Sequence, residues 1–403
     1  MFRSILAAYR EAFSGLNRAV WLLALTTLVN RSGTMVLPFL ILYLTQQQGF
    51  EPTDAGKALG VYGVGGVIGS YLGGWLCDRM SPRRVMVGSL ALSGVGFILL
   101  GQLDTRPAIL ANIFFLAVVA EGFRPANGAA VATASPPELR NRAFALNRLA
   151  VNMGMSLGPT IGGFLAMIDY DWLFIVDGVT SLFAAAVLFV AFHAEDRKPA
   201  EATAVAAPGR SPWRDRPFLV MMPLFFLLAL ITFQMASTFP LTLRDLYGFH
   251  EGRIGLVMAV NTVIIVLFEM VLVHRVGSRD PLKLVGIGGL LFGLGMALLP
   301  FGIGFAYAAF TVVIWTIGEM LAFPLSAGAV ANRSDESNRG EYMGLYTLSF
   351  EGAWVFAPIV GTWVYQTWGA KTLWLGCGAV GVIILIGFYG VSAAIAREPA
   401  RER

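Results

Sequence analysis

The chain has 403 residues, of which 56% are hydrophobic and 13% are charged, and its mean hydropathy is +0.68. A soluble domain carries about 25% charged residues, so the composition excludes a water-soluble globular protein and indicates an integral membrane protein. The net charge of +4 reflects basic residues in the predicted loops on one side of the membrane, and we expect no nucleic-acid partner.

Twelve apolar stretches, each of about 20 residues, are long enough to cross a bilayer as helices. Most of the 29 Lys and Arg residues fall in segments that place both termini on the cytoplasmic side. We therefore expect an all-α protein of a bacterial-type cytoplasmic (inner) membrane. The stretches cover residues 20–45, 57–77, 84–103, 107–132, 143–167, 172–193, 217–240, 254–273, 282–302, 304–328, 342–366 and 372–394.

The polar segments divide the chain into parts. Residues 1–19 lack the apolar core of a cleavable signal, and we interpret them as an amphipathic cytoplasmic segment. The stretch 196–216 is rich in Ala, Pro and charge and reads as a cytoplasmic linker. It separates a six-helix bundle at 20–195 from a second one at 217–395, which a short tail at 396–403 follows.

The two halves match weakly but in order when the chain is shifted by about 200 residues. "VGSLALSGVGFILLG" falls on "VGIGGLLFGLGMALLP", and "AEGFRPANGAAVA" falls on "GEMLAFPLSAGAVA". Pro38 corresponds to Pro240, and Pro159 corresponds to Pro358. In the same comparison Glu121 corresponds to Glu319. We therefore expect two pseudo-symmetric bundles, each contributing one of these acids to a central cavity.

The loop "GGWLCDRMSPRRV" joins the second and third predicted helices. It resembles the signature of the major facilitator transporters, in which Gly-x-Leu-x-Asp-Arg is followed by a turn and a basic pair. The resemblance implies twelve helices in two bundles and a gate formed by Asp78, Arg79, Arg83 and Arg84. An ordinary basic turn on the cytoplasmic side is the alternative. The corresponding loop of the second half lacks the acid, and Glu269 is the candidate replacement.

The helix predicted at 143–167 carries "NMGMSLGPTIGGFLA". Gly154, Gly158 and Gly162 share one face, with Pro159 and Gly163 beside them. Such glycines allow close helix packing, and a proline weakens the helical hydrogen bonds. The run resembles the antiporter motif of twelve-helix drug:proton exchangers, which implies export. Packing without any functional direction is the alternative interpretation.

Five charges fall near the middle of predicted membrane helices: Arg31, Glu121, Arg124, Glu319 and Glu351. A charge in that position costs at least about 2.5–3.5 kcal/mol when it faces lipid, so we expect all five to face a cavity or one another. Glu121 and Arg124 are three residues apart on one helix and can pair. Glu319 and Glu351 have no such local base, which makes them candidate proton carriers. A salt-bridge network that never titrates is the alternative.

Polar and aromatic residues in the same helices supply a candidate substrate wall, although most aromatic residues in such helices simply pack. We expect Trp354, three residues beyond Glu351, to line the cavity. Asp177, near the outer end of the helix at 172–193, is expected to be hydrated. The predicted substrate contacts are Asn30, Arg31, Tyr62, Gln234, Asn261, Trp315, Phe350 and Trp354.

Helix 304–328, with "GEMLAFPLSAG", is also similar to bacterial multidrug exporters of the major facilitator superfamily. The resemblance implies a monomeric, proton-coupled antiporter that exports amphipathic or cationic small molecules and lies among membrane lipids. The sequence contains no Walker loop, so the proton gradient is the expected energy source, without a cofactor or enzymatic activity. The three histidines are dispersed along the chain, so we expect no metal site. Cys77 and Cys377 are predicted on opposite sides of the membrane, too far apart for a disulfide.

Two other functions remain open. "NRSGTMVLPFLILYLTQQQGF" resembles the first helix of proton-coupled peptide transporters, although the acid of that cluster is absent here. Proton-coupled uptake of peptides or other nutrients is therefore the first alternative. The second is a lipid or lysolipid flippase, or a sensor that transports nothing.

Overall fold

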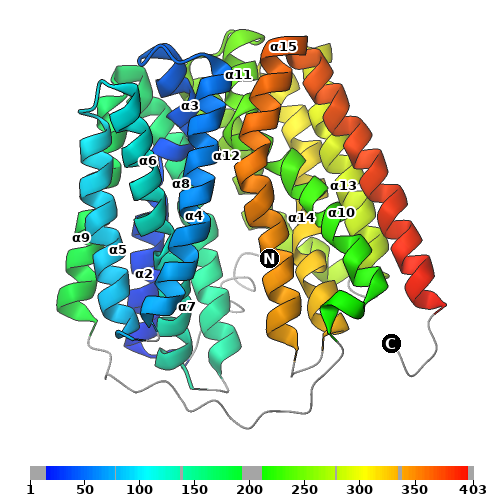
Figure 1. Ribbon diagram of the computed structural model, residues 1–403, viewed down its shortest axis with the longest axis horizontal. Coiled ribbons are helices and arrows are strands. Elements are labelled where there is room, and N and C mark those ends of the chain that lie inside the picture. Colours follow the sequence, from blue (N-terminus) through cyan, green and yellow to red (C-terminus); the bar gives the residue numbers. More distant parts are fainter. Residues whose placement is uncertain are drawn as a thin grey trace. The chain divides into compact units, whose positions relative to one another are not determined.

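The computed structural model describes residues 15–77, 79–136, 139–192, 211–276, 279–334 and 338–397. Every regular element within these ranges is a helix (Figure 1). Asp78, most of the segment 1–19, most of the linker 196–216 and most of the tail 396–403 lie outside the described residues.

The chain forms two compact units. The first comprises Met1–Leu37 and Val61–Ala200, and the second comprises Pro38–Gly60 and Glu201–Arg403. The second unit therefore includes a short segment from the predicted N-terminal half, and the predicted division into two six-helix bundles stays a prediction.

The helices follow one another with short connections. The first half contains α2 (Arg18–Ser32), α3 (Val36–Gln46), α4 (Pro52–Cys77), α5 (Pro82–Leu100), α6 (Arg106–Glu121), α7 (Phe123–Ala134), α8 (Arg140–Ile168) and α9 (Asp171–Ala191). The second half contains η2 (Pro212–Arg214), α10 (Arg216–Thr232), η3 (Phe233–Ala236), α11 (Thr238–Asp245), α12 (Glu251–Val276), α13 (Pro281–Leu298), η4 (Leu299–Phe301), α14 (Phe305–Arg333) and α15 (Arg339–Ala396).

Ten stretches of the described chain are helical, long and apolar enough to cross a membrane. The glycine-rich helix α4 is not among them, although it has 26 residues. The last stretch, Glu341–Ala396, contains two helices that meet at Gly369, where φ is 83° and ψ is 163°. Glycine suits this junction because its missing Cβ permits a positive φ. The all-helical membrane architecture is thus confirmed, and the count of twelve crossings stays a prediction.

The first membrane helix of each half is broken in its middle. α2 and α3 are separated at residues 33–35, and α10 continues through the 3₁₀ turn η3 and Ser237 into α11. Pro38 and Pro240 are the third residues of α3 and α11. A proline cannot donate a hydrogen bond to the carbonyl four residues earlier, and its ring collides with that carbonyl. The two breaks therefore lie at corresponding places of the predicted internal repeat.

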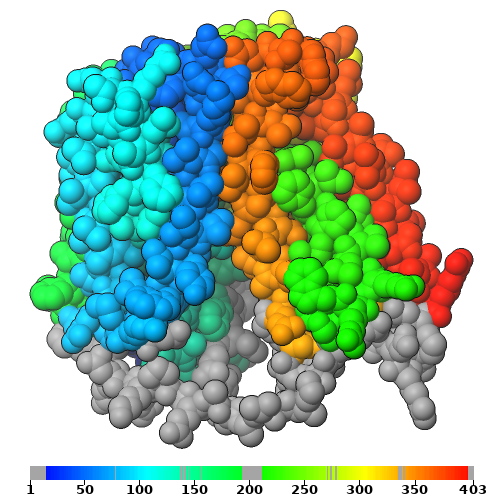
Figure 2. All heavy atoms as spheres, viewed as in Figure 1, coloured from blue at the N-terminus to red at the C-terminus, as the bar shows by residue number. Residues whose placement is uncertain are grey.

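Glycines bring the helices of the first unit into close contact. An added Cβ at Gly65, Gly69 or Gly73 of α4 would lie 2.2–2.7 Å from a backbone atom of α6 or of Gly122, which follows it. Figure 2 shows α4, α5 and α6 packed side by side on one face. The apolar core behind them includes Leu23 of α2 and Met86 of α5, both with no exposed surface. Backbone contact through small residues is the usual way for helices to associate in lipid.

Candidate functional site

A small cavity of about 30 Å³ lies within the first unit. It brings together four predicted site residues from three helices: Asn30 and Arg31 of α2, Tyr62 of α4 and Glu121 of α6. Thr34, next to the break between α2 and α3, also lines it.

Glu121 and Arg124 form the predicted pair. Nη1 of Arg124 lies 3.6 Å from Oε2 of Glu121, and Tyr62 donates from its hydroxyl to Oε1 at 3.5 Å. The side chain of Arg124 is 57% exposed and that of Glu121 is 19% exposed. Pro125 explains why α6 ends at Glu121, because a proline cannot donate to the carbonyl four residues earlier. The pair therefore stands at a helix break, beside the cavity.

Arg31 presents an unsatisfied donor in the same region. Its Nε is buried and makes no hydrogen bond to the residues that the structure describes. A guanidinium carries five N–H donors in a fixed fork, so an anionic or carbonyl group entering the cavity could satisfy the free one.

The glycine motif of α8 packs directly on the break in the first helix. A Cβ on Gly154 would lie 2.4 Å from Cβ of Arg31, and one on Gly158 would lie 2.9 Å from the carbonyl oxygen of Thr34. A Cβ on Gly162 would lie 2.9 Å from Cβ of Met35. Pro159 lies inside the continuous α8, and Gly163 beside it is buried. The motif thus allows close packing, and its link to export stays a prediction.

The expectation that Asp177 is hydrated is wrong. Its side chain has no exposed surface and accepts hydrogen bonds from two backbone N–H groups, those of Met35 and Val36, at 2.9–3.0 Å. The break before α3 leaves these donors without helical partners, and a buried N–H requires an acceptor. An acid within an apolar helix was the available signal, because such a residue must find a partner.

The second unit brings Asn261 of α12 and Glu319 of α14 together. Nδ2 of Asn261 donates to Oε2 of Glu319 at 2.7 Å and to Oγ1 of Thr316 at 3.0 Å. Asn261 is 6% exposed. Glu269, two turns further along α12, adds a second negative charge near Glu319. Asn261 was expected to contact substrate, and here it holds the predicted proton carrier.

Helix α15 carries three further predicted residues. The ring of Trp354 meets that of Phe233 edge-on at 4.5 Å, and Phe350 packs against Phe323 and Tyr346. Glu351, one residue beyond Phe350, is half-buried.

Two predicted substrate contacts lie in the packed interior of the second unit. Nε2 of Gln234 donates to the carbonyl of Ala357 at 2.9 Å, and its Oε1 accepts from Thr238 at 2.8 Å. Trp315 has no exposed surface and packs between Phe239 and Phe292. In this structure Gln234 joins the broken first helix of its half to α15 and Trp315 fills the core, and neither lines the small cavity of the first unit.

The predicted gate is described only in part, because Asp78 lies outside the described residues. Arg79 stacks on the ring of Trp75 at 3.8 Å, within the end of its own helix. Arg83 donates to the carbonyl of Phe189 on α9, and Arg84 is exposed. These contacts fasten the loop to its own unit, and the gating role stays a prediction.

A buried ion pair that was not predicted lies just before α10. Asp215 accepts from Nε and Nη2 of Arg333 at 2.6 and 2.7 Å and from the hydroxyl of Tyr342 at 2.8 Å. The side chains of Asp215 and Arg333 are 2% and 10% exposed. Burial raises the pKa of Asp215, but these hydrogen bonds outweigh it and hold the pKa below its usual value. Asp215 falls within the polar stretch 196–216, whose composition gives no sign of a packed residue.

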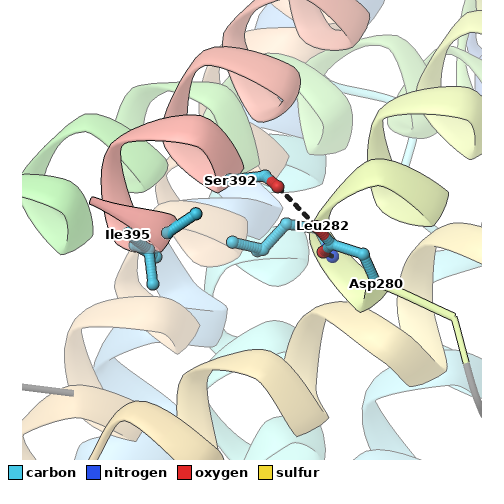
Figure 3. Close-up of a pocket in the computed structure, with 5 residues that line it drawn as sticks. Asp280, Leu282, Ser392 and Ile395 are labelled. Atoms are coloured by element: carbon cyan, nitrogen blue, oxygen red, sulfur yellow. Dashed lines mark hydrogen bonds between the residues drawn. The ribbon is translucent and has the colours of Figure 1, made fainter. Parts of the chain in front are cut away.

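A larger cavity, of about 180 Å³, lies where α13 begins beside the end of α15. Ser392 donates to the carboxylate of Asp280 (Figure 3), and Asp280 also caps α13 by accepting from the N–H of Leu282 at 3.0 Å. These bonds satisfy the carboxylate within the helix end. None of the predicted site residues that the structure describes lines this cavity.

Known transporters are similar to this chain along most of its length. A Na(+), Li(+), K(+)/H(+) antiporter of Planococcus maritimus is 25% identical over 399 residues, which cover 90% of this chain and 91% of the antiporter. The multidrug resistance protein MdtH of Yersinia pestis is 25% identical over 377 residues, covering 88% and 89%.

Solved structures share the fold. A POT family transporter in complex with a thioalcohol-conjugated peptide superimposes with a TM-score of 0.79 at 16% identity, over 96% of this chain and 99% of that one. Residues 22–351 match the family model of the Major Facilitator Superfamily. Because this match spans most of the chain, which is an all-helical protein with apolar membrane-length helices, the protein is a transporter that belongs to the Major Facilitator Superfamily.

Proposed function

We propose that this protein is a proton-coupled antiporter that exports amphipathic or cationic small molecules by alternating access. In this proposal it crosses a bacterial cytoplasmic membrane twelve times, with both termini in the cytoplasm. Counting α4 as a crossing, and counting the two helices of α15 separately, brings the ten candidate spans to twelve.

The hydrogen bond between Asn261 and Glu319 is the observation that carries the proposal. It places a carboxyl group inside an apolar helix pair with a neutral donor on one oxygen, and the nearby Glu269 adds a like charge. A carboxylate in such surroundings gains from neutralisation, either by a proton or by a cationic substrate. Competition between the two for one site is the minimum that exchange requires.

The other acids have secondary roles in this proposal. Glu351 of α15 is the second proton carrier, and the Glu121–Arg124 pair couples the first unit's cavity to the exchange. The antiporter and multidrug relatives support this reading, although each shares only 25% of its residues with this chain.

Proton-coupled uptake of peptides is the second candidate function. It is favoured by Arg31 beside the cavity, because its buried Nε makes no hydrogen bond to any described residue and suits the carboxylate of a peptide. Uptake and export differ in the direction in which protons move relative to the substrate.

Transport by purified protein in liposomes distinguishes proton-coupled export from proton-coupled peptide uptake. Ethidium, a lipophilic cation, and a neutral dipeptide such as dialanine serve as probes, and a dye trapped in the lumen reports pH. We expect ethidium to move against a proton flux in the opposite direction. Glu319→Gln should remove uphill ethidium movement, whereas Asp54→Asn, at an exposed acid paired with Lys57, should not.

Two results would contradict the proposal. Uphill ethidium transport by the double variant Glu319→Gln/Glu351→Gln would exclude both acids as carriers. Dialanine movement in the same direction as protons would instead identify a symporter.

A further inference from the structure

The clasp between Asp177 and the broken first helix is not explained by proton exchange. The carboxylate reaches from α9 to the start of α3, where it accepts from the N–H groups of Met35, which precedes the helix, and of Val36. It is the side chain of another helix, more than 140 residues away in the chain, and it is wholly buried. Burying an acid in a membrane protein is costly, and such residues usually have a functional role.

The break lies where the chain passes from one compact unit to the other. Met35, Val36 and Leu37 belong to the first unit, and the second unit includes the chain from Pro38 onward. Pro38 leaves the carbonyl of Thr34 without a helical donor. The side-chain hydroxyl of Thr34 donates to the carbonyl of Asn30 at 3.2 Å. The N–H groups of Gly33, Thr34 and Met35 still donate to the carbonyls of Val29, Arg31 and Gly33. These bonds are all local, and the carboxylate of Asp177 adds a hold from a distant helix.

The same few residues present side chains to the first unit's cavity. Asn30, Arg31 and Thr34 line it, immediately before the clasped N–H groups. On the other side, Gly154 and Gly158 of α8 allow the backbone of α8 to approach this segment closely. The segment is thus held between the glycine face of α8 and the carboxylate of α9.

The break in the first helix of the second half is stabilised by a different kind of contact. Its break follows Gln234, whose amide donates to the carbonyl of Ala357 and accepts from Thr238. Here a neutral side chain of the broken helix itself makes the connection. A clasp by an acid from another helix is therefore not a requirement of the break, and it points to a role particular to the first half.

We propose that Asp177 is the positioning residue of the first unit's cavity. By fixing the N–H groups of Met35 and Val36, it sets the direction in which Arg31 and Thr34 face the cavity. This inference rests on the proposed function only in taking the cavity as part of the substrate path.

Cysteine reporters measure this positioning without any transport assay. In a full-length background with Cys77 and Cys377 replaced by alanine, Thr34→Cys reports on the segment. Ser93→Cys, on α5 in the same cavity, is the matched reporter away from it. The rate of labelling by N-ethylmaleimide is measured for each in purified protein.

Asp177→Ala is expected to raise the labelling rate of Thr34→Cys at least fivefold and that of Ser93→Cys less than twofold. Asp177→Asn keeps one acceptor oxygen and should give an intermediate rate. Asp171→Asn, which removes an exposed acid from the start of the same helix, should leave both reporters unchanged.

Val36→Pro tests the clasp from its other end. It removes one of the two N–H donors, the one at the first position of α3, where a helix tolerates proline. It should change the labelling rate of Thr34→Cys in the same direction as Asp177→Ala does. A parallel change in both reporters would overturn the proposal, because general loosening affects the whole cavity. An unchanged labelling rate of Thr34→Cys would overturn it equally, as would failure of all three clasp variants to fold while Asp171→Asn folds.

The proposed function is tested separately. If the wild-type protein exchanges no ethidium in the liposome assay, the proposed function is refuted and the labelling rates are unaffected.

Discussion

Glu121 and Glu319 hold corresponding places in the repeat but have different partners. Glu121 meets a cation, Arg124, and the Tyr62 hydroxyl, whereas Glu319 accepts from the amide of Asn261. The first acid is thus already compensated in charge, whereas a neutral donor holds the second. The difference supports Glu319 over Glu121 as the proposed exchange site.

Asn261→Leu should reduce pH-driven ethidium transport about tenfold. Hydrogen bonds to charged groups contribute about 1.5–3 kcal/mol, and one factor of ten corresponds to about 1.4 kcal/mol. Thr316→Val is the control, because it removes the other contact of the Asn261 amide and leaves the bond to Glu319. Initial rates in liposomes measure the effect, and equal rates for Asn261→Leu and wild type would show that this bond has no role in exchange.

Arg333→Met should lower the free energy of unfolding by about 3–5 kcal/mol at pH 7, since it leaves the buried Asp215 without its cation. The pKa of Asp215 lies below its usual value. The stabilisation is therefore fully present above the unfolded value of about 4 and is lost as the pH falls through the lower folded value. The difference in thermal stability between wild type and Arg333→Met in detergent should accordingly narrow between about pH 5 and pH 3. A constant difference would mean that ionisation of Asp215 does not contribute.

At the level of whole helices, apolar runs were sufficient to place every predicted stretch on a described helix, but they did not locate the breaks. Pro38, Pro125 and Pro240 each follow a break, whereas Pro159 and Pro358 lie inside continuous helices. Each proline weakens its helix. Whether the helix breaks depends on hydrogen-bond partners that other helices supply to the freed backbone groups. Asp177 is such a partner, and no local pattern shows which helix will reach it.

The contacts of α4 with α6 explain the glycines on one face of α4, which allow the two helices to pack closely. Gly69→Ala should lower the unfolding free energy by about 1–3 kcal/mol, as overpacking does, because its Cβ would lie 2.2 Å from the carbonyl oxygen of Val118. Gly74→Ala, on the same helix with no atom within 4 Å of the added Cβ, should be neutral or stabilising by up to about 1 kcal/mol. Thermal unfolding in detergent compares the two, and equal effects would contradict close packing at Gly69.

At the scale of the whole molecule, the two compact units change over between Ala200 and Glu201, within the predicted linker, except for one segment. The segment Pro38–Gly60 belongs to the second unit, and its contacts there are specific. Gln366 of α15 donates to Glu51 at 3.1 Å, and Arg244 donates to Thr45 at 2.9 Å. These bonds join residues some 200 or 300 positions apart, which composition and hydropathy cannot reveal.

The same unit offers a direct test of alternating access. Gly56 of α4 lies so close to α15 that an added Cβ would be 2.0 Å from Oγ1 of Thr362. Cysteines at the two positions therefore need only a small outward shift to reach the Cβ separation of a disulfide, about 3.5–4.5 Å. Gly56→Cys/Thr362→Cys, in the background without Cys77 and Cys377, should therefore oxidise readily. If transport requires α4 and α15 to separate in each cycle, the oxidised protein should lose at least 90% of its ethidium transport, and a reductant should restore it. Each single cysteine variant controls for the substitution itself, because it cannot form the bond. An oxidised double variant that transports at the rate of its reduced form would show that this contact stays closed throughout the cycle, and the opening would then have to occur elsewhere in the protein.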